Sequence, residues 1–322
     1  MWPPLKRDIS MEGRNWTLVT EFILVGIPTT RALGSLLFLT FSLAYLVTIF
    51  GNSLIITLIF VDYRLHSPMY FFLSNLSFSE VLTTTCAVPK MLAGFLSDRM
   101  SISFAGCLIQ SYFYFLFGCT EFILFAVMSY DRYVAICSPL QYPMIVTSSL
   151  CVRLVILSWV GVVPLYLTIL PLCGPYVVDY IFCELPILLH MFCADTSRVE
   201  TTMAIGGAGT VLFPFLLIIL SYLRILVAVM TIDSVKGRKK AFSTCTSHLI
   251  VVIMYYGTGL IRYLRPKSLY SAEGDKLISV FYAVINPMVN PFIYSLRNKE
   301  VKEGMKKVMG RYKIKTKQQI AD

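Results

Sequence analysis

The sequence predicts an all-α membrane protein that folds as a seven-transmembrane helix bundle. Of its 322 residues, 57% are hydrophobic and only 14% are charged, and the mean hydropathy is +0.71. A soluble protein would have about a quarter of its residues charged. The apolar residues gather into runs of roughly 20 residues or more, which is the length that a helix needs to cross about 30 Å of hydrocarbon. The chain length leaves room for seven or eight such spans.

Seven apolar runs can be counted along the chain, and polar or basic residues bound each of them. Pro68 opens the second run at a first-turn position, where the missing N–H of proline costs little. Pro139 ends the third run, and a loop is expected after it. The expected spans are residues 33–61, 68–95, 104–138, 151–172, 203–232, 241–264 and 276–296, with a tail at 1–32, a bundle over 33–297, a long loop at 173–202 and a C-terminal segment at 298–322.

The distribution of basic residues predicts the orientation of the chain. Nine of the 28 Lys and Arg lie from Arg297 onward, against three acids, and four more lie in Lys236–Lys240. Basic segments that flank membrane spans stay in the cytoplasm. Seven spans carry the two termini to opposite sides, so the N-terminal tail and the long loop are expected outside the cell and the C-terminus inside it. The chain is thus expected to be a multi-pass protein of the plasma membrane.

Two features of the expected outer side agree with this orientation. Asn15 begins an Asn-Trp-Thr acceptor for N-glycosylation in the tail. Four cysteines map to the same side, where disulfides persist. Sequence alone allows three pairings among them: they are Cys107, Cys173, Cys183 and Cys193.

The two ends of the chain leave alternatives open. Residues 1–32 contain several charged side chains and no continuous apolar core, which argues against a cleavable signal peptide. Translation from Met1 or from Met11 fits the sequence equally well. Near the C-terminus, apolar residues recur at helical spacing between lysines, which predicts a short amphipathic helix on the inner leaflet; a disordered basic tail is the alternative.

Polar side chains inside the spans mark candidate functional positions. Glu80 and Glu121 are expected within the membrane, where a carboxylate implies a cation, a proton or a polar partner; static hydrogen bonding between helices is the alternative. One face of the third span carries side chains at spacings of 4, 3 and 11 residues, which are near whole turns: Tyr114, Gly118, Glu121 and Arg132. This face reaches over about 27 Å.

Two further spans repeat such features. In the sixth span, His248, Tyr256, Gly259 and Tyr263 follow one another at spacings of 8, 3 and 4. In the seventh, Asn290 and Pro291 remove a backbone hydrogen bond and predict a bend near Tyr294. The Tyr294 side chain could change partners at this bend or simply pack.

Other classes of protein fit the sequence poorly. The chain has three histidines and none of the HExxH, GxSxG or phosphate-binding glycine motifs, so an enzyme is not expected. The basic residues flank apolar runs and are not interleaved with aromatic residues, which argues against nucleic-acid binding. An ion-coupled transporter or channel could use Glu80 and Glu121, but the chain halves show no internal repeat and no matching pair of broken helices.

Four segments carry a resemblance to a known family. MSYDRYVAIC (Met128–Cys137) and PMVNPFIYSLRN (Pro287–Asn298) resemble motifs of the class A, rhodopsin-like G-protein-coupled receptors. Together with LHSPMYFFLSNLS (Leu65–Ser77) and KAFSTCTSHL (Lys240–Leu249), they resemble the signature segments of the olfactory receptors over about residues 20–300. The departures from the usual residues of the family remove no functional group: they are Ser67, Ser129, Gln141 and Val289.

The resemblance implies roles for individual residues. It implies disulfides Cys107–Cys183 and Cys173–Cys193. Glu80 and Glu121 match positions that can hold a sodium ion in this family, and no other cofactor is expected. Asp131 would hold Arg132 in the resting state and release it toward a G protein. The residues implied in activation and coupling are Asp131, Arg132, Tyr133, Tyr222, Tyr256, Asn290, Pro291 and Tyr294.

The resemblance also implies an odorant-binding pocket in the outer half of the bundle. Tyr114 stands where amine-binding receptors carry an aspartate, so a small neutral volatile ligand is expected. Binding would activate a stimulatory, olfactory-type heterotrimeric G protein and raise cyclic AMP. The lining residues implied are Tyr114, Phe115, Gly118, Cys119, Gly206, Gly207, Thr210, Gly259, Leu260, Tyr263 and Ala283.

Overall fold

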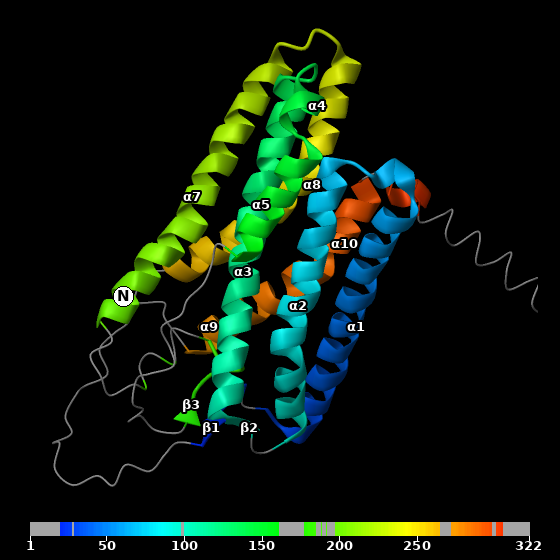
Figure 1. Ribbon diagram of the computed structural model, residues 1–322. Helices are drawn as coiled ribbons and strands as arrows, with labels where there is room; N and C mark the ends of the chain where they lie inside the picture. Colours follow the sequence, from blue (N-terminus) through cyan, green and yellow to red (C-terminus); the bar gives the residue numbers. More distant parts are fainter. Residues whose placement is uncertain are drawn as a thin grey trace, which may run out of the picture.

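Long helices make up most of the structure, a computed structural model (Figure 1). It describes residues 20–27, 29–97, 100–160, 177–184, 188, 191, 197–264, 272–297 and 301–304. The long helices are α1 (Arg31–Val61), α2 (Pro68–Leu96), α3 (Phe104–Cys137), α5 (Ser148–Val160), α7 (Ser197–Met230), α8 (Val235–Leu264), α9 (Ala272–Val280) and α10 (Asn286–Arg297). The short elements are β1 (Glu21–Leu24), η1 (Tyr63–Leu65), β2 (Met100–Ser103), α4 (Tyr142–Ile145), β3 (Val177–Val178) and the π-helix η3 (Phe281–Ile285).

Local capping explains where the first helices begin. Thr30 precedes α1, and its hydroxyl oxygen accepts a hydrogen bond from the Leu33 N–H. Ser103 precedes α3 and accepts from the Gly106 N–H at 3.1 Å. Pro68 is the first residue of α2. Such side chains satisfy N–H groups that have no partner within the helix, so these helices begin close to the expected residues.

Other helices extend beyond the spans expected from hydropathy. α7 begins at Ser197 rather than at residue 203, and α8 begins at Val235 rather than at 241. Ser234 starts α8, because its hydroxyl accepts from the Gly237 N–H at 3.3 Å and its carbonyl from the Arg238 N–H at 2.9 Å. Backbone hydrogen bonds can continue past the last apolar turn, so the membrane boundary does not end a helix.

Two loop expectations also need correction. The segment after Pro139 contains the short helix α4, and the last residues of the expected loop 173–202 belong to α7. The seventh span is three elements, since η3 lies between α9 and α10. Residues 161–172 of the expected fourth span lie outside the described residues.

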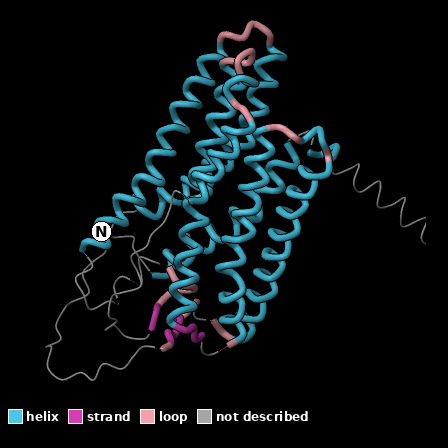
Figure 2. Tube along the Cα trace, in the orientation of Figure 1, coloured by secondary structure: helices cyan, strands magenta, loops and turns pink. Residues whose placement is uncertain are grey.

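A small three-stranded sheet covers one end of the bundle (Figure 2). β1 lies in the middle, antiparallel to β2 with Glu21 opposite Ser103, and parallel to β3 with Ile23 opposite Val177. The Cys107–Cys183 disulfide lies at this end and joins α3 to the segment that follows β3. We call it the disulfide end, and we call the opposite end, where α3 finishes, the Arg132 end.

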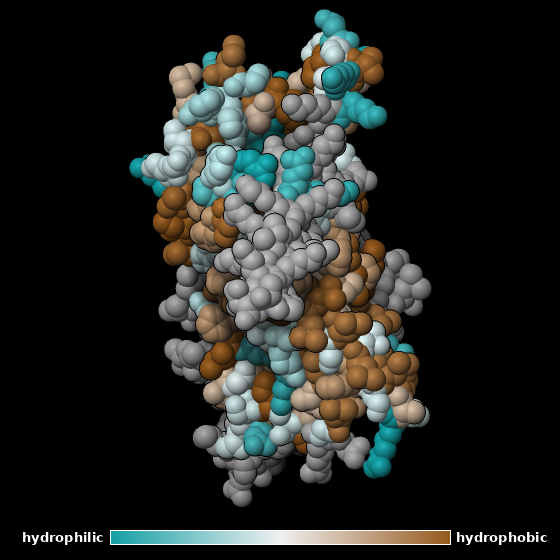
Figure 3. Space-filling view, turned by 90° about the vertical axis from the view of Figure 1, so that its right-hand side faces the viewer, coloured by the Kyte–Doolittle hydropathy of each residue, from teal (hydrophilic) through white to brown (hydrophobic). Residues whose placement is uncertain are grey.

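Large apolar side chains are exposed on several helices, α1 and α7 among them, and Figure 3 shows apolar patches on one face of the molecule. Four of the described helical segments are long and apolar enough to cross a membrane: Arg31–Val61, Phe104–Cys137, Ile205–Met230 and Glu273–Ser295. In α3, 61% of an 18-residue apolar stretch is buried inside the protein, whereas in α7 only 17% of such a stretch is buried. The α3 helix is therefore central and the α7 helix peripheral. The α2 helix is not among these four segments, and it buries several serine and threonine side chains inside the bundle.

Close contacts join the first and last helices. A Cβ at Gly51 would lie 3.0 Å from the Pro291 side chain, so glycine lets α1 and α10 approach. The Asn52 amide donates to the Pro287 carbonyl at 3.1 Å. Past α10, residues 301–304 are helical, and the Val301 side chain is buried. The described start of the C-terminal segment thus packs against the bundle; the remainder of the expected amphipathic helix lies outside the described residues.

Candidate functional site

Aromatic rings from four parts of the chain meet between the centre and the disulfide end. The Tyr114 ring lies 4.9 Å from Phe182 and 6.3 Å from Tyr282. The Phe122 ring lies 5.0 Å from Tyr256 and 6.2 Å from Tyr282. These five rings form what we call the aromatic cluster. It brings α3, α8, η3 and the segment after β3 together around two residues, Tyr114 and Tyr256, that the sequence analysis singled out.

Small residues of α3 border this cluster. A Cβ at Gly118 would lie 3.1 Å from the Tyr282 hydroxyl, so glycine makes room for the tyrosine. The Cys119 thiol donates to the Thr210 hydroxyl at 3.8 Å and links α3 to α7. Ala283, the neighbour of Tyr282, is buried on the disulfide side. These predicted lining residues therefore lie on helices that face each other.

Other predicted lining residues make fewer contacts. Apart from chain neighbours and the backbone of the same helix, no described heavy atom lies within 4 Å of the Cβ position of Gly206, Gly207 or Gly259. Phe115 is half-buried, and it has no described aromatic partner. The side chains of Leu260 and Tyr263 lie outside the described residues. These three glycines therefore leave space beside α7 and α8 among the described residues.

Glu121 is fully buried on α3 and accepts two side-chain hydrogen bonds. The Thr83 hydroxyl donates at 2.7 Å and the Tyr282 hydroxyl at 3.3 Å. The carboxyl group therefore joins α2, α3 and η3. Since Tyr282 also belongs to the aromatic cluster, any shift of that ring changes the contacts of Glu121.

Glu80 is also buried and lies nearer to α8 and α10. The Asn290 amide and the Tyr255 hydroxyl donate to its Oε1, the latter at 3.2 Å. Glu80 Oε2 and Asn290 Oδ1 have no hydrogen-bond partner among the described residues. The same holds for Thr84 and Asn286, each one helical turn away from this pair. Buried oxygen atoms of this kind suit a hard cation such as sodium.

The Arg132 end contains a second polar arrangement. Asp131 Oδ2 pairs with the Arg132 guanidinium, and the Tyr142 hydroxyl donates to Asp131 Oδ1 at 2.6 Å. Burial, and then the hydrogen bond and charge of Asp131, raise the pKa of the Tyr142 hydroxyl above its usual range. The hydroxyl therefore stays protonated at neutral pH and holds α4 against the end of α3.

Tyr222 and His248 connect α7 with α8 near the same end. The Tyr222 hydroxyl and His248 Nδ1 are 2.7 Å apart, and their rings stack at 5.9 Å. Tyr133 packs in the same small cluster as Tyr222. Tyr294 is buried, and its hydroxyl has no partner among the described residues, so it packs as an aromatic ring in this arrangement.

Sequence reasoning missed several residues of these networks. Tyr282 was missed because η3 is a π-helix, whose rotation per residue differs from the regular helix assumed. Tyr255 was overlooked beside its neighbour Tyr256. Thr83 could have been found, since it lies one turn after Glu80 on α2. Cys173, Cys193 and Asn15 lie outside the described residues.

The arrangement can be compared with known proteins. Residues 41–312 match the model of the olfactory receptor family. The chain belongs to the olfactory receptor family. Human olfactory receptor 10A7 is 48% identical over 301 residues, covering 92% of this chain and 95% of the relative. Human olfactory receptor 5I1 is 47% identical, covering 92% and 96%. The dog olfactory receptor-like protein OLF1 is 47% identical, covering 93% and 98%.

A solved structure supports the fold of this olfactory receptor. Squid rhodopsin superposes with a TM-score of 0.68 at 18% sequence identity, covering 88% of this chain and 82% of that one. The receptor therefore has the rhodopsin-like seven-helix fold. It is a multi-pass protein of the plasma membrane and not an enzyme. The alternative of a transporter or channel finds no support in these similarities.

Proposed function

We propose that this receptor binds a small, neutral, volatile compound against the aromatic cluster and activates a stimulatory heterotrimeric G protein at the Arg132 end, raising cyclic AMP. One observation carries the proposal. Tyr282 contacts Tyr114 and approaches Gly118, and its hydroxyl donates to Glu121. A ligand that moves this ring therefore acts at once on a buried polar network.

The chemistry around the cluster supports a neutral ligand. Glu121 already accepts hydrogen bonds from Thr83 and Tyr282, so an amine would compete with both for its carboxyl group. Burying a cation without a free counter-ion is costly. The Tyr256 hydroxyl is buried without a partner among the described residues, and it can bond one polar group of a ligand. We propose that the other pocket residues implied by the resemblance line the same binding site.

Signal transfer would follow the buried side chains toward the Arg132 end. Glu121 is joined to α2, Glu80 to α8 and α10, and Tyr222 to α8. The receptor would exist in a resting and an active arrangement of its helices. A ligand shifts the equilibrium between them only by the difference between its affinities for the two. We propose that the active arrangement separates α8 from α7 near Tyr222 and frees Arg132 for the G protein.

We also propose an orientation of the receptor in the membrane and a bound sodium ion. The disulfide end would face outward with the glycosylated Asn15, and a second disulfide would join Cys173 to Cys193. A sodium ion would fit the buried oxygen atoms around Glu80 that have no other described partner. Such an ion supplies a positive charge that balances the carboxylates. Glu80 itself would hold the ion and, through Asn290, keep α10 against α2.

A cell assay tests this function. Cells that express the receptor are exposed to a chemically diverse odorant panel while cyclic AMP is recorded. Compounds that act on the receptor should lose their effect after Arg132→Ala at equal surface expression. Arg153→Ala is the control, because Arg153 lies exposed on α5. A response that survives in Arg132→Ala would show that the proposed role of Arg132 is wrong.

A further inference from the structure

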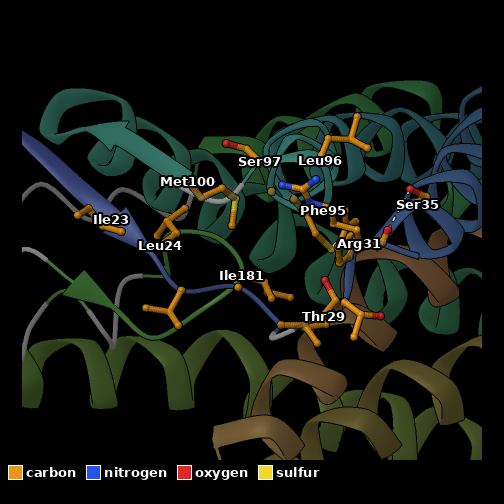
Figure 4. Close-up of a pocket in the computed structure, with 16 residues that line it drawn as sticks. Ile23, Leu24, Thr29, Arg31, Ser35, Phe95, Leu96, Ser97, Met100 and Ile181 are labelled. Carbon is orange, nitrogen blue, oxygen red and sulfur yellow. Dashed lines mark hydrogen bonds between the residues drawn. The ribbon is translucent and has the colours of Figure 1, made fainter. Parts of the chain in front are cut away.

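A cavity of about 560 Å³ lies at the disulfide end, apart from the aromatic cluster (Figure 4). It is bounded by β1 and the segment that leads to α1, by the first turns of α1, and by the last turns of α2. Met100 of β2 and Ile181 close the remaining sides. Its volume falls in the range of about 300–1,000 Å³ that is typical of small-molecule sites.

One wall of the cavity is apolar. Phe95 and Leu96 come from the end of α2, and Met100 and Ile181 lie opposite α1 (Figure 4). Met100, Ile181 and the nearby Leu24 are almost fully buried by the protein around them. An apolar chain bound against this wall would lose its contact with water, which favours binding in proportion to the area covered.

The opposite wall is polar and carries one charge. Arg31 and Ser35 on α1 face the end of α2, and Thr29 lies beside them (Figure 4). Among the described residues that line the cavity, Arg31 alone is charged. The part of the chain that the structure describes contains no acidic partner for Arg31, whereas it gives Lys276 a partner in Asp179. Within this part of the chain, the exposed Arg31 guanidinium can therefore serve as the cation that meets an anionic ligand.

The cavity is held open by hydrogen bonds of the framework. Gly26 lines it, and its N–H donates to the Tyr180 carbonyl at 3.2 Å. The Gly26 carbonyl accepts from the Lys276 ammonium at 2.8 Å. The Val25 N–H donates to the Val178 carbonyl at 2.9 Å. Three hydrogen bonds from two separate segments therefore fix this wall, and a ligand would meet a largely preformed site.

We propose that this cavity binds a small amphipathic anion, of which a medium-chain carboxylate is the simplest form. The planar guanidinium of Arg31 can donate two parallel hydrogen bonds to a carboxylate. The hydrocarbon chain would lie against Phe95, Leu96 and Met100. The site does not depend on the proposed odorant site, because none of its lining residues belongs to the aromatic cluster.

Direct binding of tritium-labelled decanoate tests this site. The full receptor is held in nanodiscs of phosphatidylcholine, so that no anionic lipid competes. Saturable binding is expected, about tenfold weaker after Arg31→Gln because the charged hydrogen bonds are lost. Ser35→Trp should abolish it by filling the cavity.

The matched controls are Arg153→Gln and Leu36→Trp, since both side chains are exposed away from the cavity. Unlabelled decanol, which has no charge, should compete at least about tenfold less well than decanoate.

The outcomes separate the cavity from other modes of binding. Binding that does not saturate, or that Arg31→Gln and Ser35→Trp leave unchanged, would overturn the proposal. Loss of decanoate binding in Gly118→Trp with full binding in Ser35→Trp would assign decanoate to the odorant site and also overturn it. The unfolding temperature of each variant without ligand serves as a check on folding, and decanoate should raise it only where the site is intact.

Discussion

The two ends of this receptor are held together by different kinds of bond. At the disulfide end, Cys107–Cys183 joins α3 to the segment after β3, and the Gln110 side chain accepts from the Cys183 N–H at 2.9 Å. A sheet and the Lys276 contacts with Gly26 and Asp179 add to this. At the Arg132 end, the described side-chain hydrogen bonds across α3, α4, α7 and α8 involve few groups, chiefly those of Tyr142 and Tyr222.

The weaker bonds at the Arg132 end make that end the one that can move. A disulfide contributes about 2–4 kcal/mol to stability, whereas a single hydrogen bond contributes about 0.5–1.5 kcal/mol. Opening the Arg132 end therefore costs little, whereas opening the disulfide end requires several contacts to break together. The proposed odorant site lies toward the more firmly held end, and the proposed G-protein site lies at the more adaptable end. This arrangement would let a ligand control a conformational change at the far end.

The strongest test of this contrast removes the disulfide. Cys183→Ser should lower surface delivery at least about tenfold, because a bond worth about 2–4 kcal/mol holds the segment after β3 to α3. Flow cytometry of an N-terminal tag measures delivery. Cys137→Ser, which changes a free cysteine at the other end, should have little effect. Normal delivery and response of the Cys183 variant would mean that the disulfide does not secure this end.

The next test breaks the noncovalent part of the same end. Lys276→Met removes the donor to the Gly26 carbonyl and the partner of Asp179. The loss should lower the free energy of unfolding by about 1–2 kcal/mol, since the partly buried Gly26 carbonyl is left without this donor. Thermal unfolding of purified receptor measures it, with the exposed Lys236→Met as control. An unchanged unfolding temperature would leave the disulfide as the main constraint.

A change at the Arg132 end should affect signalling more than stability. Tyr222→Phe removes the hydrogen bond to His248 that holds α7 to α8. Losing about 1 kcal/mol from the closed arrangement should raise basal cyclic AMP about fivefold at equal surface expression. Tyr130→Phe, at an exposed position on α3, serves as control. Basal signalling equal to that of the unmodified receptor would contradict the idea of a weakly held end.

The smallest effect is expected at α4. Tyr142→Phe removes one donor from Asp131, but Asp131 keeps its pairing with Arg132. Basal cyclic AMP should therefore rise only about twofold, which corresponds to a few tenths of a kcal/mol. Because the pKa of Tyr142 is raised, its hydroxyl donates throughout the neutral range, and mild changes of pH should not reproduce the effect. An effect larger than that of Tyr222→Phe would mean that the Tyr142 hydrogen bond holds the resting arrangement more strongly than the Tyr222 hydrogen bond does.

The sequence predicted those features that depend on local rules. Helical periodicity assigned Tyr114, Gly118 and Glu121 to one face, and all three lie near Tyr282 or bond to it. Apolar runs, with Pro68 at the start of the second, predicted starts for the first three helices close to those observed. Hydropathy did less well at α7 and α8, because polar residues continue a helix beyond the membrane.

By itself, the sequence determined the family, the helical membrane fold and the burial of Glu80 and Glu121, since composition, motifs and helical spacing are properties of neighbouring residues. The resemblance implied the pairing of Cys107 with Cys183, and the tertiary structure confirms it. Only the tertiary structure decided that Tyr282 reaches Glu121 and that β1 and Arg31 enclose a cavity with the end of α2. These contacts join segments far apart in the chain, and they follow from how the helices pack and from the turn of the π-helix, which no local pattern encodes.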